Sequence, residues 1–285
     1  MTARSPLVSI ITACYNSEKT LENTLLSVLN QSCRDIQYIV IDGLSSDGSR
    51  DIIKKYGDRL GYWVSEKDKG ISDAWNKGLR LAEGEIVGII NSDDQYRECA
   101  VETAVKALND NPEAGFVFGD QLIIDEKGVA INQRGDPGYM KNIWFIMPSI
   151  PHSTVFVRRR VYERYGGFDI TYSTAMDYEF LLRITAGGVR GVYVPSVLTV
   201  MSMGGESDLN FVRGYREVMR ASVKYGYDSR MALARFYFEC LKTYTRKKMQ
   251  RAGLEAPVRL YRKYIGKRYD YPDFERHLNH REHRD

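Results

Sequence analysis

Three apolar runs that each end abruptly in polar residues constrain the fold of this chain more than any other feature of its sequence. The runs occupy residues 8–14, 36–41 and 86–90, and the polar residues that follow are Tyr-Asn, Asp-Gly and Asn-Ser-Asp-Asp. Parallel strands are buried on both faces and therefore read as continuous apolar runs. Open α/β sheets bind ligands outside the carboxyl ends of such strands. The sequence therefore predicts a ligand site built from three strand ends.

Strand-like and helix-like patterns alternate along the first part of the chain, which is typical of a parallel α/β sheet. Further strands are expected at residues 62–65 and 116–118, and helical spacing lies between the strands, at residues 17–29, 49–56, 72–83 and 100–108. Residues 120–175 break this rhythm with strand-like pieces at 122–124 and 154–157 and with loops rich in Gly and Pro. Loops on a rigid sheet often carry substrate contacts, so we expect a second substrate to bind there.

The size of the chain fits one large α/β domain with an appendage. We place the domain at residues 1–225 and a helical tail at residues 226–285. Residues 230–285 contain 15 Lys and Arg against 7 Asp and Glu, whereas the whole chain has a formal net charge of only +4. The tail is also rich in aromatic residues, among them Tyr261 and Tyr264. This asymmetry predicts a separate anionic partner for the tail.

Composition excludes several classes of protein. An apolar content of 43% and a charged content of 27% are ordinary for a soluble globular chain. No run of about 20 apolar residues exists, so no spanning helix is expected, and the first residues lack the apolar segment of a secretory signal. Four cysteines without a Cys-x-x-Cys pair predict reduced, structural thiols and a cytoplasmic protein.

The three strand ends, together with Met176-Asp-Tyr-Glu179, resemble the motifs of family 2 glycosyltransferases with the GT-A fold. The resemblance covers roughly residues 7–200, and the four motifs stand in the order of the family. It implies a Rossmann-like, mostly parallel central sheet flanked by helices, to which this chain adds the basic helical tail. It also implies a nucleotide-binding half at about residues 1–120 and an acceptor-binding half at about 121–225.

The implied activity is the transfer of a sugar from a nucleotide-diphosphate sugar to a hydroxyl group, with inversion at the anomeric carbon. We expect a UDP-sugar, with GDP and dTDP left open, and a growing, lipid-linked bacterial surface glycan such as an O-antigen or lipopolysaccharide as the acceptor. The resemblance assigns donor binding to Thr12, Tyr15, Asn16, Asp42, Lys69, Gly70, Asp73, Asn76, Asn91, Ser92 and Asp94. In the same set, Asp47 fits either a donor contact or a helix cap.

One departure from the family pattern concerns the segment Glu66–Gly78. Many members have Arg before the Asn of this segment, whereas this chain has Trp75 before Asn76. The phosphate-binding cation of this helix is therefore open, and Lys69 is a candidate. Gly70 allows a close approach of the backbone to the nucleotide, and the helix start beside it favours anions.

A second departure concerns the metal. The resemblance places a "DxD" metal motif at Asn91-Ser92-Asp93, but Asn stands where the first Asp is expected. Asp94 follows and keeps two carboxylates together. We therefore assign Asp93 as the leading ligand and Asp94 as the supporting one. Oxygen ligands of this kind suit Mn²⁺ or Mg²⁺ bridging a diphosphate.

Asp177 stands where the family has its general base. Glu179 follows two positions later, and successive helical residues diverge by about 100°, so only one of these two carboxylates can comfortably face the reacting carbon. Position favours Asp177. His152 and Glu179 are accessory candidates for metal or acceptor contacts, with a structural role as the alternative for His152.

The sequence fits two other enzyme classes less well than a glycosyltransferase. A nucleotidyltransferase or a dinucleotide-dependent oxidoreductase usually carries a Gly-rich loop after the first strand, and the residues after Cys14 contain none. A catalytically degenerate nucleotide-sugar-binding module is the third possibility.

For the tail, an anionic membrane surface is favoured over nucleic acid and over packing on the domain. The protein would then be peripheral on the inner face of the cytoplasmic membrane, and the Tyr-rich tail could also pack against a second copy as a homodimer.

Overall fold

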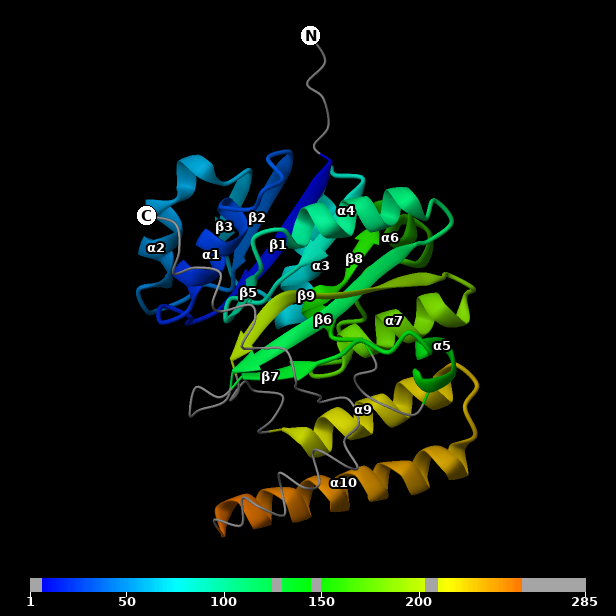
Figure 1. Ribbon diagram of the computed structural model, residues 1–285. Coiled ribbons are helices and arrows are strands. Elements are labelled where there is room, and N and C mark those ends of the chain that lie inside the picture. Colours follow the sequence, from blue (N-terminus) through cyan, green and yellow to red (C-terminus); the bar gives the residue numbers. More distant parts are fainter. Residues whose placement is uncertain (1–6, 125–129, 145–149, 203–209, 253–285) are drawn as a thin grey trace, which may run out of the picture.

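The computed structural model describes residues 7–124, 130–144, 150–202 and 210–252. Its centre is one twisted sheet with helices on both faces, and a pair of long C-terminal helices lies along one side (Figure 1). Strands follow the order β3-β2-β1-β4-β8-β6-β9-β5, and β7 pairs with β6. The mixed α/β architecture with a parallel nucleotide-side sheet confirms the expected fold class.

The first half of the sheet is parallel. It contains β3 (Tyr62–Ser65), β2 (Ile36–Asp42), β1 (Val8–Cys14) and β4 (Ile86–Ile89). All seven residues of β1 are buried, as the continuous apolar run predicts. The predicted strands of this region are all confirmed, and their carboxyl ends lie at one edge of the sheet.

The second half of the sheet is more irregular than expected. Residues 116–118 and 122–124 belong to one strand, β6 (Phe116–Ile124), and a register shift near Asp120 separates them. The others are β8 (Phe156–Arg158), β9 (Gly191–Ser202), β7 (Ala130–Gln133) and β5 (Asp94–Tyr96). β5 begins at Asp94 itself because Asp94 pairs with Met201 of β9, a contact between distant parts of the chain.

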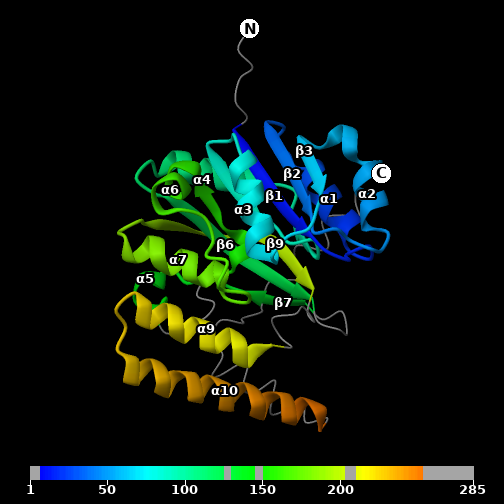
Figure 2. The same cartoon turned by 180° about the vertical axis from the view of Figure 1, so that it is seen from behind.

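Alternate residues of β1 belong to two separate cores. Ile10 packs on the face covered by α1 (Leu21–Leu29), α2 (Ser49–Lys55) and α4 (Ala100–Asp110). Ile11 packs on the opposite face, which holds α3 (Ile71–Leu81), α6 (Arg159–Tyr165), α7 (Met176–Ala186) and α9 (Phe211–Lys224). Figure 2 shows α3, α7 and α9 on this second face. Short pieces are α5 (Tyr139–Asn142), η1 (Gly57–Arg59) and η2 (His152–Thr154).

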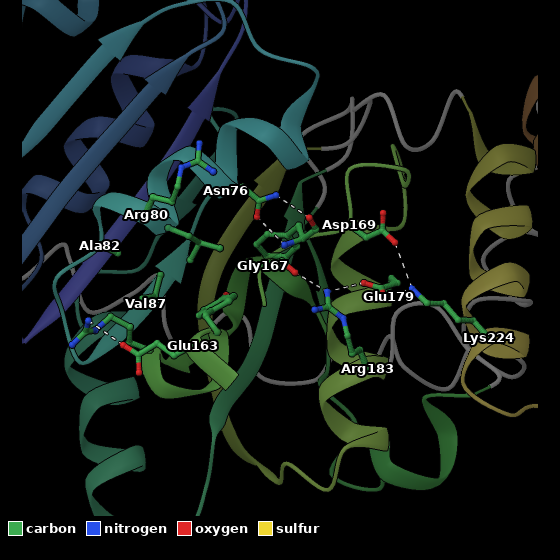
Figure 3. Close-up of a pocket in the computed structure, with 14 residues that line it drawn as sticks. Asn76, Arg80, Ala82, Val87, Glu163, Gly167, Asp169, Glu179, Arg183 and Lys224 are labelled. Atoms are coloured by element: carbon green, nitrogen blue, oxygen red, sulfur yellow. Dashed lines mark hydrogen bonds and ion pairs between the residues drawn. The ribbon is translucent and has the colours of Figure 1, made fainter. Parts of the chain in front are cut away.

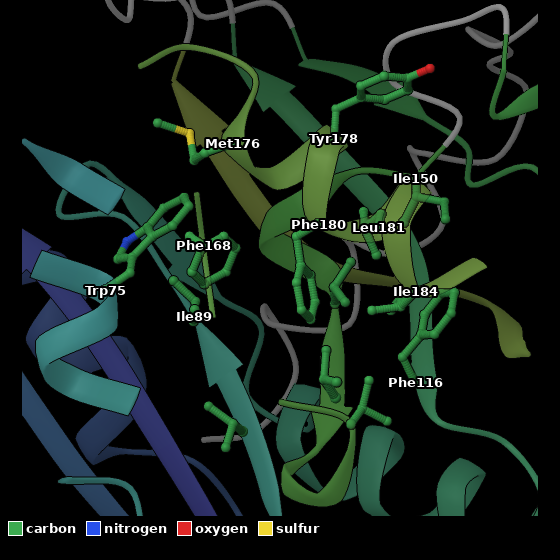
Figure 4. Packing of buried hydrophobic residues seen from close by; sticks show 14 of the residues in the cluster. Trp75, Ile89, Phe116, Ile150, Phe168, Met176, Tyr178, Phe180, Leu181 and Ile184 are labelled. Atoms are coloured by element: carbon green, nitrogen blue, oxygen red, sulfur yellow. The ribbon is translucent and has the colours of Figure 1, made fainter. Parts of the chain in front are cut away.

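Aromatic side chains join α3 to α7 in this second core (Figure 4). The rings of Trp75 and Phe168 are 4.8 Å apart between centroids, and those of Phe168 and Phe180 are 5.1 Å apart. Aromatic pairs at these separations add about 0.5–1.5 kcal/mol each beyond the area that they bury. The packing therefore fixes the helix that carries Asp177 relative to α3 and the parallel half of the sheet.

The tail begins with α10 (Ser229–Arg251), which confirms the helix expected there. α10 packs along α9 after a turn at Gly226, whose φ of 101° lies in the left-handed region. Phe238 and Leu241 of α10 are 55% and 66% exposed. Tyr261 and Tyr264 lie outside the described residues. Among the described helices, none is long and apolar enough to cross a bilayer.

Candidate active site

Hydrogen bonds join the loops after β1, β2 and β4 into one edge. The backbone N–H of Asn16 donates to Ser45 Oγ over 2.8 Å, and Asn16 Oδ1 accepts from the N–H of Ser46 over 2.9 Å. Ser92 shares a 2.8 Å hydrogen bond with Ser17, hydroxyl to hydroxyl. Asn16 has a φ of 49°, a left-handed conformation that Asn tolerates better than most residues. The predicted residues Asn16 and Ser92 therefore lie close together.

The strand ends offer one exposed aromatic ring. Tyr15 is 66% exposed, directly after β1. Thr12 is fully buried, and its hydroxyl shares a 3.0 Å hydrogen bond with the hydroxyl of Tyr38 inside the sheet. Of these two predicted donor contacts, only Tyr15 presents its side chain to solvent.

Asp42 lies where the sequence predicts, at the end of β2, but its carboxylate faces the protein. It is fully buried and accepts hydrogen bonds from Ser45 Oγ over 2.5 Å and from Ser65 Oγ over 2.6 Å. The backbone N–H of Ser45 donates to it as well, over 3.1 Å. The chain itself therefore supplies the partners of this carboxylate, which holds the loop in shape.

A different carboxylate reaches the surface beside Tyr15. A Cβ atom added at Gly43 would lie 2.6 Å from Asp68 Oδ2 and 3.4 Å from Cδ2 of Tyr15. Gly43 thus leaves room for Asp68, which sequence reasoning missed. The signal was present, because Asp68 stands two residues before Gly70 in the segment already singled out.

The start of α3 presents backbone and a cation. Gly70 has a φ of 106° and open space where a side chain would be. Its N–H donates to Asp68 Oδ1 over 2.8 Å, and the N–H of Lys69 donates to Asp73 Oδ2 over 3.1 Å. The Lys69 side chain is exposed. The side chain of Lys69 and the empty space beside Gly70 are therefore accessible to a ligand. The Asp73 carboxylate accepts a hydrogen bond within the turn.

Asn76 connects two parts of the fold. Its amide donates to the carbonyl of Phe168 and accepts from the N–H of the same residue, each over 2.8 Å. A side-chain amide used on both sides in this way has little left for a nucleotide. The predicted donor residue Asn76 thus ties α3 to the Gly-Gly-Phe-Asp turn before α7.

The acidic pair after β4 is unusual. Asp94 is 1% exposed, and neither carboxylate oxygen has a hydrogen-bond partner among the described residues. Burial, and next the neighbouring charge of Asp93, raise the pKa of Asp94 well above its usual range. A buried carboxylate without donors needs a proton or a cation. The described residues contain no group of three or more His, Cys, Asp or Glu side chains that could hold a metal ion. A cation at this loop would therefore have the two carboxylates of Asp93 and Asp94 as its protein ligands.

Across from this loop, Asp177 lies near the start of α7. Its Oδ2 is 3.7 Å from Nδ1 of His152, and its buried Oδ1 has no partner among the described residues. His152 Nε2 is 3.1 Å from the amide nitrogen of Asn91. The structure therefore brings together Asn91, His152 and Asp177, which the sequence separates by 61 and 25 residues.

The amino end of α7 is held by a residue that the sequence analysis did not identify. Glu217 of α9 is 7% exposed and accepts from the backbone N–H groups of Ser173, Thr174 and Ala175, the last two over 2.8 and 2.9 Å. Burial opposes the charge, but these hydrogen bonds outweigh it and lower the pKa of Glu217. A carboxylate at a helix start is favourable because free N–H groups and the helix dipole meet there.

Glu179, the second acid of α7, faces the opposite way. It is fully buried and bonded to Arg183 over 2.9 Å and to Lys224 over 3.2 Å (Figure 3). It also accepts from the hydroxyl of Tyr225 over 2.5 Å. It belongs to the wall of a pocket of about 620 Å³ whose lining does not include Asp93, Asp94 or Asp177. Glu179 therefore lies in a structural network rather than beside Asp177.

Comparison with known proteins agrees with this geometry. The profile described as "Glycosyl transferase family 2" matches residues 9–166. An uncharacterized glycosyltransferase of Mycobacterium tuberculosis is 30% identical over 184 residues, which cover 63% of this chain and 69% of that protein. The putative teichuronic acid biosynthesis glycosyltransferase TuaG of Bacillus subtilis is 32% identical over 136 residues, covering 47% of this chain and 54% of the relative.

Solved structures share the fold at lower identity. TarS of S. aureus, residues 1–349, superposes with a TM-score of 0.60 at 19% identity, covering 81% of this chain and 70% of that one. A mannosyltransferase from Pyrobaculum calidifontis in complex with GDP-Man and Mn²⁺ superposes with a TM-score of 0.60 at 20% identity, covering 92% and 82%. With its profile match, its strand-end loops and its acidic pair after β4, the chain belongs to glycosyltransferase family 2.

Proposed function

We propose that this glycosyltransferase moves a sugar from a nucleotide-diphosphate sugar, with a UDP-sugar as the first candidate, to a hydroxyl of a bacterial surface glycan, inverting the anomeric carbon. One observation carries the proposal. The loop of Asp93 and Asp94 and the free oxygen of Asp177 belong to one site, because His152 lies between Asn91 and Asp177. A leaving-group side at Asp93 and Asp94 and an acceptor side at Asp177 would suit single displacement.

The acceptor side would use the carboxylate of Asp177, whose side chain is 23% exposed, as the general base. The acceptor O–H proton would pass to this carboxylate while the acceptor oxygen bonds to C1. The bond from C1 to the diphosphate breaks, and its electron pair leaves with the diphosphate. Attack from the side opposite the leaving group gives inversion.

The leaving-group side fits a divalent cation. Asp93 and Asp94 supply carboxylate oxygens, and those of Asp94 are buried without donors. Mg²⁺ and Mn²⁺ are commonly held by one or two carboxylates together with substrate phosphates. When bound, the cation would neutralise the charge that develops on the diphosphate. The exposed Lys69 and the open backbone at Gly70 would lie on the same nucleotide.

Structures of neighbours hold related ligands. TarS has been solved with UDP and with UDP-GlcNAc, and the Pyrobaculum enzyme with GDP-Man and Mn²⁺. These structures support a nucleotide-sugar donor and a divalent cation for this chain. Which nucleobase the donor carries is left to experiment. We propose that the nucleobase of the donor contacts the ring of Tyr15. Asp68 lies near this ring, because both side chains lie close to Gly43.

A thermal-shift panel tests the donor and the metal together. UDP, GDP, dTDP and CMP are each added with Mn²⁺ or with EDTA. A ligand at about 100 times its Kd stabilises by about 2.7 kcal/mol. We expect one nucleotide to raise Tm only with Mn²⁺, and Asp93→Ala to abolish the shift, while the control Asp110→Ala at the exposed end of α4 keeps it. If no nucleotide shifts Tm with or without Mn²⁺, the proposal of a nucleotide-sugar donor is refuted.

We further propose that the α10 tail holds the protein at an anionic membrane surface on the cytoplasmic side, near a lipid-linked acceptor. Its outward side exposes Tyr237, Leu241 and Tyr244 at 62–66%. The segment 229–251 has 7 Lys and Arg against one acid, Glu239, which is 9% exposed and bonded to Arg235 and Lys242. Outward-facing aromatic and apolar side chains on a segment with an excess of Lys and Arg fit an anionic interface.

Vesicle co-sedimentation of the full chain tests the tail. Vesicles of phosphatidylglycerol and phosphatidylcholine should bind the protein, and the variant with Tyr237, Leu241 and Tyr244 all changed to Ser should stay in the supernatant. Matched changes at the exposed Tyr62 and Met140 should have no effect. Equal binding by both variants would refute the membrane proposal, and a change in mass on light scattering would favour the homodimer instead.

A further inference from the structure

The two places where this chain departs from its family pattern meet at one side chain, His152. Asn91 stands where the metal motif begins with Asp, and its amide nitrogen is 3.1 Å from His152 Nε2. Trp75 stands where many members have Arg, and its ring centroid is 6.0 Å from that of His152. Two departures that share one neighbour suggest one common cause.

The contact with Asn91 determines which ring nitrogen carries the proton. An amide N–H can only donate, so Nε2 of His152 must accept, and the proton of the neutral ring then lies on Nδ1. Nδ1 faces Asp177 Oδ2 at 3.7 Å. An Asp at position 91 would accept from Nε2 instead and would favour an imidazolium with protons on both nitrogens.

Trp75 confines the ring from the side. It is 2% exposed and packs on Phe168 as well as on His152. An Arg at this position would place a cation beside the imidazole. The ring therefore lies between an amide, an indole and a carboxylate.

We propose that Asn91 and His152 act as a positioning pair for the base: Asn91 fixes the Nδ1–H form of His152, and this N–H, 3.7 Å from Asp177 Oδ2, holds the Asp177 carboxylate in place for the acceptor. The inference rests on the proposed function, in which Asp177 is the base. His152 keeps its proton throughout, and the acceptor proton goes to Asp177. Asn91 thus serves the acceptor side, although it belongs to the loop that carries the metal ligands.

Nitrogen NMR tests the first half of the proposal without any substrate. The chain has four histidines, of which His277, His280 and His283 lie near the C-terminus, so the variant His152→Gln assigns the signal of His152. Two-bond ¹H–¹⁵N correlation spectra should show the proton on Nδ1. Asn91→Asp should give an imidazolium, and the control Asn23→Asp on the exposed face of α1 should change nothing. A proton on Nε2 in the unaltered protein would overturn the proposal.

Turnover tests the second half, using hydrolysis of the nucleotide sugar that the thermal-shift panel selects. His152→Ala should lower kcat by about 100-fold, the typical effect of a misplacement of about 1 Å, with KM for the nucleotide sugar unchanged. His152→Asn, whose amide N–H can replace Nδ1–H, should recover most of kcat. A loss in KM alone, or equal losses in both variants, would refute a positioning role. The NMR result stands even if the donor proposal fails, so the two failures are distinguishable.

Discussion

The two sides of helix α7 carry acids of opposite character. Asp177 has one oxygen 3.7 Å from His152, and the other is buried without a partner among the residues that the structure describes. Glu179 faces the interior, where three donors bind its two oxygens. Two positions on one helix turn side chains about 200° apart, so one acid has an unpartnered oxygen and the other joins a network of donors. The number of partners, rather than the type of residue, distinguishes the two roles.

The largest effect is expected from Asp177→Asn. An amide cannot take the proton of the acceptor, and general base catalysis contributes about 10²–10⁴-fold, so kcat should fall by this factor. Tm and the nucleotide-dependent thermal shift should remain unchanged, because Asp177 stabilises neither the fold nor the donor. Initial rates and melting curves measured on the same preparation check both statements. If Asp177→Asn lowered Tm as much as a substitution in the core, Asp177 would be a structural acid like Glu179.

Glu179→Gln should show the reverse pattern. It leaves Arg183 and Lys224 without their shared carboxylate, and breaking a buried ion pair costs about 3–5 kcal/mol. Lys224 is 46% exposed and can turn to solvent, so we expect the lower end of this range. Urea unfolding followed by circular dichroism measures the loss. The kcat of the folded fraction should stay near that of the unaltered protein, and a 100-fold loss there would place Glu179 in the chemistry.

A smaller and pH-dependent effect is expected from Glu217→Gln. The variant keeps the shape but loses the charge at the start of α7, where hydrogen bonds to a charged acceptor contribute about 1–3 kcal/mol. The pKa of Glu217 is lower in the folded protein than its ordinary value of 4.5. Its stabilisation is therefore complete above pH 4.5 and is lost as the pH falls through the lower folded value.

Urea titrations at a series of pH values check this prediction. The difference in unfolding free energy between the unaltered protein and Glu217→Gln should be constant near neutral pH and should shrink below pH 4.5. Glu113→Gln at the exposed surface provides the matched control and should show no such difference. A gap that persists unchanged in acid would mean that Glu217 acts through packing alone.

The parallel half of the fold could be read from the sequence because its signals are local. Each strand is a run of apolar residues, and each polar end follows directly, so Tyr15, Asn16 and the acidic pair were located correctly. Asp177, the first acid of α7, came instead from the resemblance to the family. Periodicity of this kind survives in a single sequence because each element carries its own pattern.

The orientation of individual side chains could not be read, because it depends on distant partners. Asp42 accepts from Ser65, 23 residues away, and Asn76 bonds to Phe168, 92 residues away. β5 exists because Asp94 meets Met201 of β9. Glu217 lies 42 residues after Ala175, whose N–H it accepts. No spacing rule connects such pairs, so a polar residue at a strand end is ambiguous between a ligand contact and a structural one.

The carboxylate that α9 places on α7 extends the working unit of this protein beyond the region that matches its family. The matched segment ends at residue 166, before α7 begins, and the support for α7 comes from residue 217. A chimera that joined the first 200 residues to another C-terminal part would keep every motif. It would still lose the Glu217 carboxylate that accepts hydrogen bonds at the amino end of α7. Exchange of modules in this enzyme should therefore be made after Lys224, not after the last strand.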